Sequence, residues 1–301
     1  FAALVGMGGA PRASIQEGRG DLEGARQIMG NSFSLLILAS AVLTVVFRVF
    51  AEPLLLTFGA SENTIGYALD YMNIYSLGTL FVQVTLGMNA YITAQGFTTV
   101  SMKTVLIGAG LNTLLDPIFI FGLGMGVRGA ALATILSQAV SAAWVLRFLT
   151  SPQTKWRLRR ETLRLQPKVF LPSLALGLSP FIMQSTESLI AVCFNSSLLK
   201  YGGDLAVGAM TVLTSMMQFA MMPLQGLSQG AQPIVSYNFG ARNAQRVKDA
   251  FRCLLKSCVI YSAVLWAVVQ LFPQVFVRIF NNNPELVDYA AWALRIYMGT
   301  T

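Results

Sequence analysis

The chain has 301 residues, of which 54% are hydrophobic and only 11% are charged. A soluble domain usually carries about a quarter charged residues, so this composition indicates a membrane protein. The net charge is +8 and there is no histidine, which excludes Ser-His-Asp and Cys-His catalysis and most zinc sites.

Apolar segments long enough to cross a bilayer, about 20 residues each, recur along the whole chain. A fragment of one occupies 1–10, and another begins near 286 and is cut off at 301. The complete ones are 33–51, 74–94, 104–127, 129–146, 169–199, 205–233 and 257–277. No charge lies between 205 and 241, although a helix exposed to water needs a charged face. The sequence therefore predicts an all-α membrane protein.

The positive charges gather in alternate loops. Segments 10–32, 95–103, 147–168 and 235–256 hold 16 of the 21 Lys and Arg residues. Because basic residues collect on the cytoplasmic side, we expect these loops to be cytoplasmic. The basic run at 155–160 then lies beside anionic lipid headgroups. A nucleic-acid partner is not expected, since the run contains a single aromatic residue.

An internal repeat appears when the sequence is shifted by 222 residues. Gly8 then meets Gly230 and Gly18 meets Gly240, without a gap. Six spans separate equivalent points, so the two copies have the same orientation and should be related by a pseudo-two-fold axis along the membrane normal.

The repeat predicts two six-helix lobes in a twelve-span architecture, of which about eight and a half spans are present. The N-terminal lobe is expected at 1–150, a cytoplasmic linker at 151–168 and the C-terminal lobe at 169–301. We expect the first span and the last spans to lie outside this chain.

Several strings resemble the multidrug and toxic compound extrusion (MATE) family, of the bacterial multidrug efflux type. The most specific are Asn-x-x-x-Asp-Pro at 112–117 and Gly-x-Gly-Val-x-Gly-Ala-Ala at 124–131, with supporting glycine-containing strings at 8–10, 18–21, 230–233 and 238–242. The likeness covers nearly the whole chain. It implies an antiporter that exports organic, often cationic, compounds in exchange for H⁺ or Na⁺. It also implies a multi-pass monomer of the cell inner or plasma membrane, without a cofactor.

Asp116 is the first candidate site residue. A carboxylate at mid-bilayer costs about 2.5–3.5 kcal/mol on insertion scales, so it usually has a function. Asn112 lies four residues earlier on the same helix face, and Pro117 cannot donate to the carbonyl of Thr113. The carboxylate of Asp116, the amide oxygen of Asn112 and the freed carbonyl of Thr113 would together suit H⁺ or Na⁺. The resemblance adds Thr134 on the next helix and an acidic residue on the first helix. The alternative is a buried, inert cap at a proline kink.

Glu187 is the second candidate cation-binding residue, because it is the only charge between Lys168 and Lys200. Apolar surroundings favour the protonated form of a lone carboxylate, so this group could exchange protons. It resembles an acidic residue on the seventh helix of bacterial MATE exporters. The alternative is a structural hydrogen bond between lobes.

A polar face at helical spacing predicts a substrate cavity, since polar groups that point into lipid are costly. The residues assigned to this cavity are Thr211, Ser215, Gln218 and Met222, with Gln184 and Gln83 as further members. Met216, beside this face, suits a cavity that accepts varied shapes. Ordinary hydrogen bonding between helices is the alternative.

Three other functions fit the sequence less well than antiport does. A lipid-linked precursor flippase of the same superfamily would need a cationic cavity for an anionic headgroup, but both interior charges are acidic. An intramembrane enzyme lacks a histidine, a close acid pair and a Ser-Lys dyad. A channel would not explain two isolated carboxylates.

Overall fold

The structure, a computed structural model, describes residues 1–57, 64–278 and 284–298. At 188, 191–196, 198–209, 211, 212, 284–286, 288 and 289 it describes the backbone alone. Within the described residues, the elements are helices and there is no strand, which agrees with the predicted all-α membrane fold. The α-helices are α1 (Ala2–Gly18), α2 (Leu22–Val49), α3 (Ala51–Thr57), α4 (Ile65–Tyr75), α5 (Thr79–Ala94), α6 (Thr98–Pro117), α7 (Gly126–Thr150), α8 (Pro167–Gly240), α9 (Ala244–Leu271), α10 (Pro273–Arg278) and α11 (Pro284–Tyr297). The shorter elements are η1 (Ser76–Gly78), η2 (Ile118–Gly122) and η3 (Arg160–Leu163).

The predicted loops at 10–32 and 235–256 are mostly helical, which corrects the expected span boundaries. Within these two segments, the helices are interrupted only between α1 and α2 and between α8 and α9. Asp21 accepts a hydrogen bond from the backbone N–H of Gly24 at 2.8 Å, and Asn243 accepts one from Arg246 at 3.1 Å. These side chains cap the free N–H groups of α2 and α9, so each helix begins well before its apolar stretch.

The helix boundaries repeat with the same shift of 222 residues as the sequence. Helix α2 spans Leu22–Val49 and α9 spans Ala244–Leu271, so both ends correspond, and so do the caps Asp21 and Asn243. The α1–α2 turn holds Gly20 at a φ of 88°, and its counterpart in the α8–α9 turn is Arg242 at a φ of 55°. The duplication therefore extends from residue types to backbone conformation.

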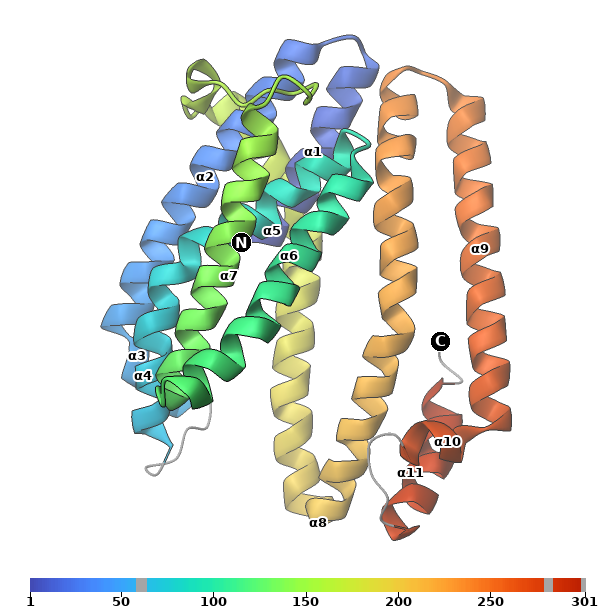
Figure 1. Ribbon diagram of the computed structural model, residues 1–301. Helices are drawn as coiled ribbons and strands as arrows, with labels where there is room; N and C mark the ends of the chain where they lie inside the picture. The colour runs from blue at the N-terminus through green and yellow to red at the C-terminus, as the bar shows by residue number, and fades with distance from the viewer. Residues whose placement is uncertain (58–63, 279–283, 299–301) are drawn as a thin grey trace. The chain divides into compact units, whose positions relative to one another are not determined.

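The chain forms two compact units, Phe1–Phe181 with Ser236–Arg242 (unit 1) and Ile182–Val235 with Asn243–Thr301 (unit 2). The expected lobe limits at 150 and 169 remain predictions. Helix α8 contributes to both units. Its 74 residues would form a rod of about 110 Å if straight, but α8 folds back on itself, as the yellow and orange arms in Figure 1 show. Two spans were predicted in this region.

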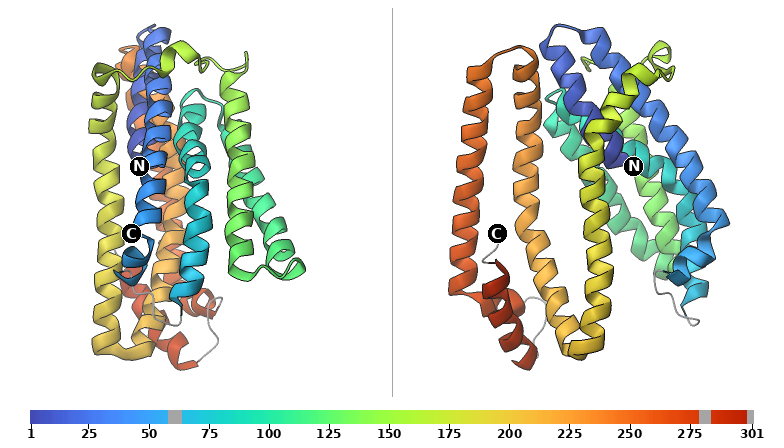
Figure 2. Two further views of the ribbon diagram at one scale, coloured as in Figure 1. Left: turned by 90° about the vertical axis from the view of Figure 1, so that its left-hand side faces the viewer. Right: turned by 180° about the vertical axis from the view of Figure 1, so that it is seen from behind.

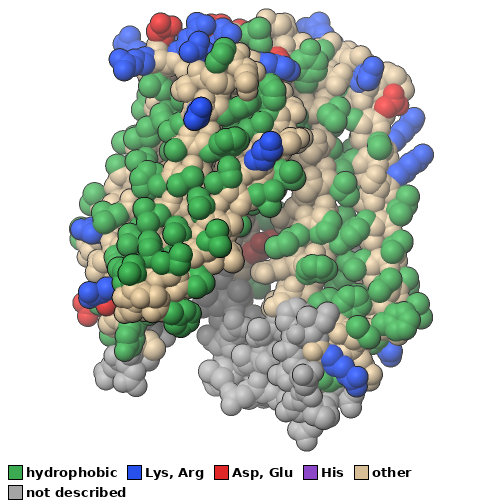
Figure 3. Space-filling model, viewed as in Figure 1, with side chains coloured by type: hydrophobic (Ala, Val, Ile, Leu, Met, Phe, Trp, Pro, Cys, Tyr) green, Lys and Arg blue, Asp and Glu red, His purple; other side chains and the backbone are tan. Residues whose placement is uncertain are grey.

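Unit 1 has its core where α1 packs on α2 and α5, and where α5 packs on α7. Its largest fully buried side chains include Trp156, Tyr91, Met29, Leu36 and Met88. On the outside of α2, Leu38, Val42, Val45 and Val49 are each more than half exposed. Such an apolar outer face suits a helix in lipid. Figure 3 shows hydrophobic side chains over the flanks of these helices and Lys and Arg gathered at the end that carries the linker.

Helices α1 and α8 meet at glycines that are equivalent in the repeat. A Cβ on Gly18 would overlap the carbonyl oxygen of Tyr237, and one on Gly240 would overlap that of Ile15. Residues 15 and 237 are also 222 apart, so the contact is reciprocal, as in an isologous interface. Only glycine allows two backbones to approach this closely.

Unit 2 has its own core, in which α8 buries Leu213, Met216 and Ala220 against Val269 of α9 and Leu294 of α11. Met216 is therefore a core residue, which corrects its expected place beside the substrate cavity. Residues three and four apart lie on the same face of a helix. This spacing therefore gives α8 a polar stripe on one face and an apolar stripe on the opposite face.

Candidate functional site

Asn112 and Asp116 lie on one face of α6, as their spacing predicted. Asn112 Nδ2 donates to Asp116 Oδ1 at 3.2 Å. Both side chains are half-buried. The amide thus holds the carboxylate in a defined direction while leaving its second oxygen for another partner.

Thr134 of α7 completes the cluster, because α6 and α7 pack together. Asn112 Nδ2 also lies 3.5 Å from Thr134 Oγ1, and that hydroxyl donates its proton to the carbonyl of Ala130 at 2.9 Å. A hydroxyl has one proton, so Thr134 offers only lone pairs to the side of Asn112. The structure brings together the three residues assigned to this site, and the resemblance supplied the third.

Pro117 ends α6 and is followed by a π-helical turn, η2. Proline has no N–H, so the carbonyl of Thr113 receives no α-helical hydrogen bond from residue 117. The backbone widens, and Leu123 N donates to the carbonyl of Ile118 at 2.8 Å. Widened turns of this kind are frequent at functional sites, and this one begins two residues after Asp116.

A groove of about 210 Å³ runs from Asn112 and Thr134 between α5, α6 and α7. Its polar lining comes from Thr85, Thr104, Asn112, Thr134, Ser137, Gln138 and Ser141.

The serine hydroxyls of this groove donate their hydrogen bonds to backbone carbonyls. Ser137 donates to Ala133 at 2.8 Å, and Ser141 donates to Thr104 at 3.3 Å. Gln138 Oε1 is buried without a hydrogen-bond partner among the described residues. The groove therefore presents oxygen acceptors, which suit a cation or a hydrogen-bond donor better than an anion.

This part of the site was not predicted from the sequence, although the signal was present. Residues 134, 137, 138 and 141 recur at helical spacing on α7, which is the pattern that singled out the polar face of α8. The sequence instead predicted Gln83 as a further member of the substrate cavity. It is only 9% exposed on α5, its Oε1 has no partner among the described residues, and it does not line this groove.

Glu187 lies on α8 in unit 2, and its side chain is exposed rather than enclosed. The expectation of an apolar enclosure is therefore not met within unit 2. Gln184, one helical turn earlier, is exposed on the same stretch.

The polar face of α8 lies away from the core of unit 2. Ser215 is half-buried, whereas Gln218 is exposed and Met222 is 67% exposed. The side chain of Thr211 lies outside the described residues. The placement agrees with a face separate from the packed core.

Comparison with known proteins gives consistent matches. The MatE family model matches residues 1–118 and 180–301. The multidrug export protein MepA of Staphylococcus haemolyticus (strain JCSC1435) is 28% identical over 305 residues, covering 99% of this chain and 66% of that protein. MepA of Staphylococcus aureus (strain NCTC 8325 / PS 47) is 25% identical over 299 residues, covering 99% of this chain and 65% of that protein.

Among solved structures, the MATE multidrug transporter DinF-BH in complex with R6G superposes with a TM-score of 0.90 at 35% identity, covering 98% of this chain and 66% of that chain. An outward-facing MATE family transporter of the MOP superfamily has a TM-score of 0.88 at 24% identity, which supports the fold alone. The chain spans about 65% of the length of its curated relatives. Because the MatE model accounts for most of the chain, and a transporter of the same family shares its fold at 35% identity, the chain belongs to the multidrug and toxic compound extrusion (MATE) family, whose members are transporters rather than enzymes.

Proposed function

We propose that this chain works in a secondary antiporter that exports organic, often cationic, compounds across the cell inner or plasma membrane in exchange for H⁺ or Na⁺. The observation that carries the proposal is the cluster of Asp116, Asn112 and Thr134, in which the amide nitrogen of Asn112 lies against one carboxylate oxygen of Asp116 and against the hydroxyl oxygen of Thr134. The relatives named as multidrug export proteins support the substrate class.

The cluster can bind either coupling ion at the same carboxylate. Protonation removes the charge of Asp116 and turns one oxygen into a donor. A Na⁺ ion would instead be held by the carboxylate with Thr134 Oγ1, because hard cations prefer oxygen ligands. In both cases the occupied site carries no net charge. Binding therefore lowers the free-energy cost of keeping the Asp116 side chain of α6 inside the bilayer. That difference can bias a two-state transporter.

We assign the second acidic position to Glu187 and the substrate contacts to the polar face formed by Thr211, Ser215, Gln218 and Met222, together with Gln184. The exposure of Gln218 and Met222 away from the core of unit 2 supports this assignment. A flippase for an anionic lipid precursor is disfavoured, because Asp116 and Glu187 would repel its headgroup.

The test uses everted membrane vesicles with R6G as the transported dye, because a relative of known structure binds it. An imposed pH or Na⁺ gradient should drive R6G uptake, and Asp116→Asn should reduce gradient-driven uptake at least tenfold. Asp70→Asn is the matched control, since Asp70 pairs with Arg128 at 2.9 Å and lies outside the cluster. Gradient-driven uptake that survives Asp116→Asn at the wild-type rate would refute the assigned role.

A further inference from the structure

The linker between α7 and α8, residues 151–166, is an ordered segment, which we call the ribbon. Its two sides differ in burial and in charge. Figure 2 shows it crossing the ends of α1 and α2 on its way from α7 to α8. Its residues alternate, with Thr154 and Trp156 buried and Lys155, Arg157 and Arg159 exposed. This period of two is that of an extended chain. One side of the ribbon is anchored to unit 1 and the other carries positive charge.

Gln95, at the end of α5, anchors the first part of the linker. Its Oε1 accepts from Thr154 Oγ1 at 2.6 Å and from the backbone N–H of Trp156 at 2.9 Å. The indole of Trp156 is fully buried, and Leu158 N donates to the carbonyl of Leu149 at 2.8 Å. The backbone that carries Arg157 and its neighbours is therefore held in place.

Helix α2 anchors the second part. Asn31 Oδ1 accepts from the backbone N–H of Gln166 at 2.7 Å, and Ser34 Oγ donates to the carbonyl of Leu163 at 2.7 Å. Thr162 is buried against Gly30, where a Cβ would overlap it. The ribbon is thus fastened at both ends.

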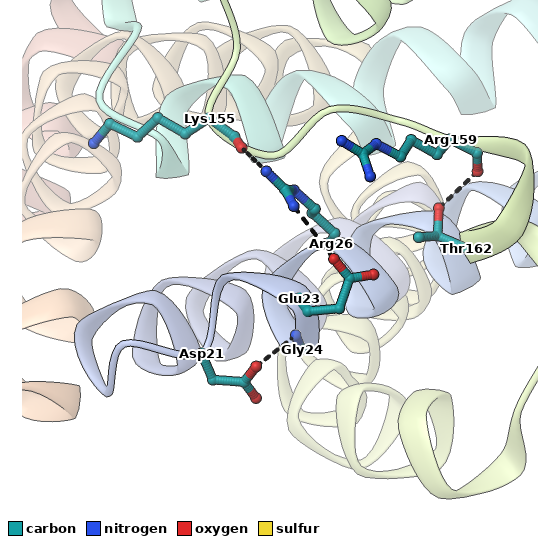
Figure 4. Close-up of polar contacts among 7 residues, drawn as sticks. All are labelled: Asp21, Glu23, Gly24, Arg26, Lys155, Arg159 and Thr162. Carbon is teal, nitrogen blue, oxygen red and sulfur yellow. Dashed lines mark hydrogen bonds and ion pairs between the residues drawn. The ribbon is translucent and has the colours of Figure 1, made fainter.

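Nearby carboxylates already have partners within the protein. Figure 4 shows Asp21 turned to the N–H of Gly24, and Arg26 placed between Glu23, at 3.3 Å, and the carbonyl of Lys155, at 3.5 Å. Lys155 in turn pairs with Glu17 at 3.3 Å.

The other basic side chains of the linker have no carboxylate partner among the described residues. Among the described residues, Arg157, Arg159, Arg160 and Arg164 form no ion pair, and the only acidic residue of the linker is Glu161. Arg157 Nε donates to the carbonyl of Thr150 at 2.8 Å, which fixes the direction of its guanidinium.

We propose that this ribbon is a preorganised site for the phosphate headgroups of anionic phospholipids in the cytoplasmic leaflet. Guanidinium groups bind phosphate through paired hydrogen bonds, and the predicted orientation puts the linker on the cytoplasmic side. The ribbon leads into α8, where Leu171 and Leu176 are 55% and 56% exposed and can contact acyl chains. A lipid therefore meets charge and apolar surface together, whereas a free phosphate meets only the charge.

The binding test compares fluorescent phosphatidylglycerol with fluorescent phosphatidylcholine on the purified full-length protein in mixed micelles. Each basic residue near a membrane surface contributes about 1 kcal/mol toward anionic lipid. The triple variant Arg157→Gln, Arg159→Gln and Arg160→Gln should therefore lower the preference for phosphatidylglycerol by on the order of 100-fold at low salt.

The matched control removes three charges from the start of α9, also predicted to be cytoplasmic, as Arg246→Gln, Lys248→Gln and Arg252→Gln. General attraction to an anionic surface also acts on these side chains, but no anchored ribbon directs them at one headgroup, so this variant should lower the preference clearly less than the linker variant does. Equal losses in both triple variants, or no loss in the linker variant, would overturn the proposal.

A second variant tests preorganisation without removing charge. Gln95→Leu releases the first anchor and should also weaken the preference, in protein whose helical circular dichroism is unchanged. An unchanged preference would contradict an ordered site. Displacement of the lipid by inorganic phosphate, beyond that by chloride at equal ionic strength, would assign the site to free phosphate instead. Since no transport is measured, these outcomes do not depend on the proposed antiport.

Discussion

The reciprocal contact of Gly18 and Gly240 gives a sharp test of how α1 and α8 pack. A Cβ on Gly18 would overlap the carbonyl oxygen of Tyr237 and lie 3.0 Å from Ala241 N. Because these are backbone atoms, the helices must separate to admit it. Overpacking of this kind costs about 1–3 kcal/mol, so Gly18→Ala and Gly240→Ala should each destabilise the protein by that amount.

The double variant should cost less than the sum of the two single variants, because one separation of α1 from α8 relieves both overlaps. The free energy of unfolding can be followed in detergent by tryptophan fluorescence during denaturant titration. Gly226→Ala is the control, since a Cβ there would meet nothing within 4 Å. It should stabilise α8 by up to about 1 kcal/mol through helix propensity. Additive costs to within about 0.5 kcal/mol, or a neutral Gly18→Ala, would refute the reciprocal contact.

Two further predictions address the site and the repeat. Thr134→Val keeps the shape of the side chain but removes an acceptor of Asn112, a loss of about 0.5–1.5 kcal/mol. The coupling-ion concentration for half-maximal R6G transport should then rise about 2- to 10-fold, and an unchanged value would exclude Thr134 from the site. Arg242→Gly should stabilise the protein, because Arg242 has a φ of 55° and the left-handed conformation costs a non-glycine residue about 1–2 kcal/mol. Its counterpart Gly20→Ala should destabilise by a similar amount, and thermal melts that move both variants in the same direction would contradict this reasoning.

The sequence alone predicted the membrane class, the helical fold and the duplication. These depend on composition and on the lengths of apolar segments, which are properties of the chain itself. It misplaced the starts of α2 and α9, because their first turns are polar and only the caps at Asp21 and Asn243 show that the helix has begun.

The shared face of Asn112 and Asp116 also followed from sequence, since four residues make about one turn of a helix. The groove of Thr85, Ser137, Gln138 and Ser141 did not, because it requires α5, α6 and α7 to meet. Likewise, Trp156 belongs to the basic run at 155–160, and only the tertiary structure buries it.

Spacing along one helix is set by local backbone geometry, so the sequence by itself determined which residues share a face. Which helix packs against that face depends on side-chain fit between residues far apart in the chain. Hence the approach of α1 to α8 through Gly18 and Gly240, the opposition of Thr134 to Asn112, and the anchored linker were decided only by the tertiary structure.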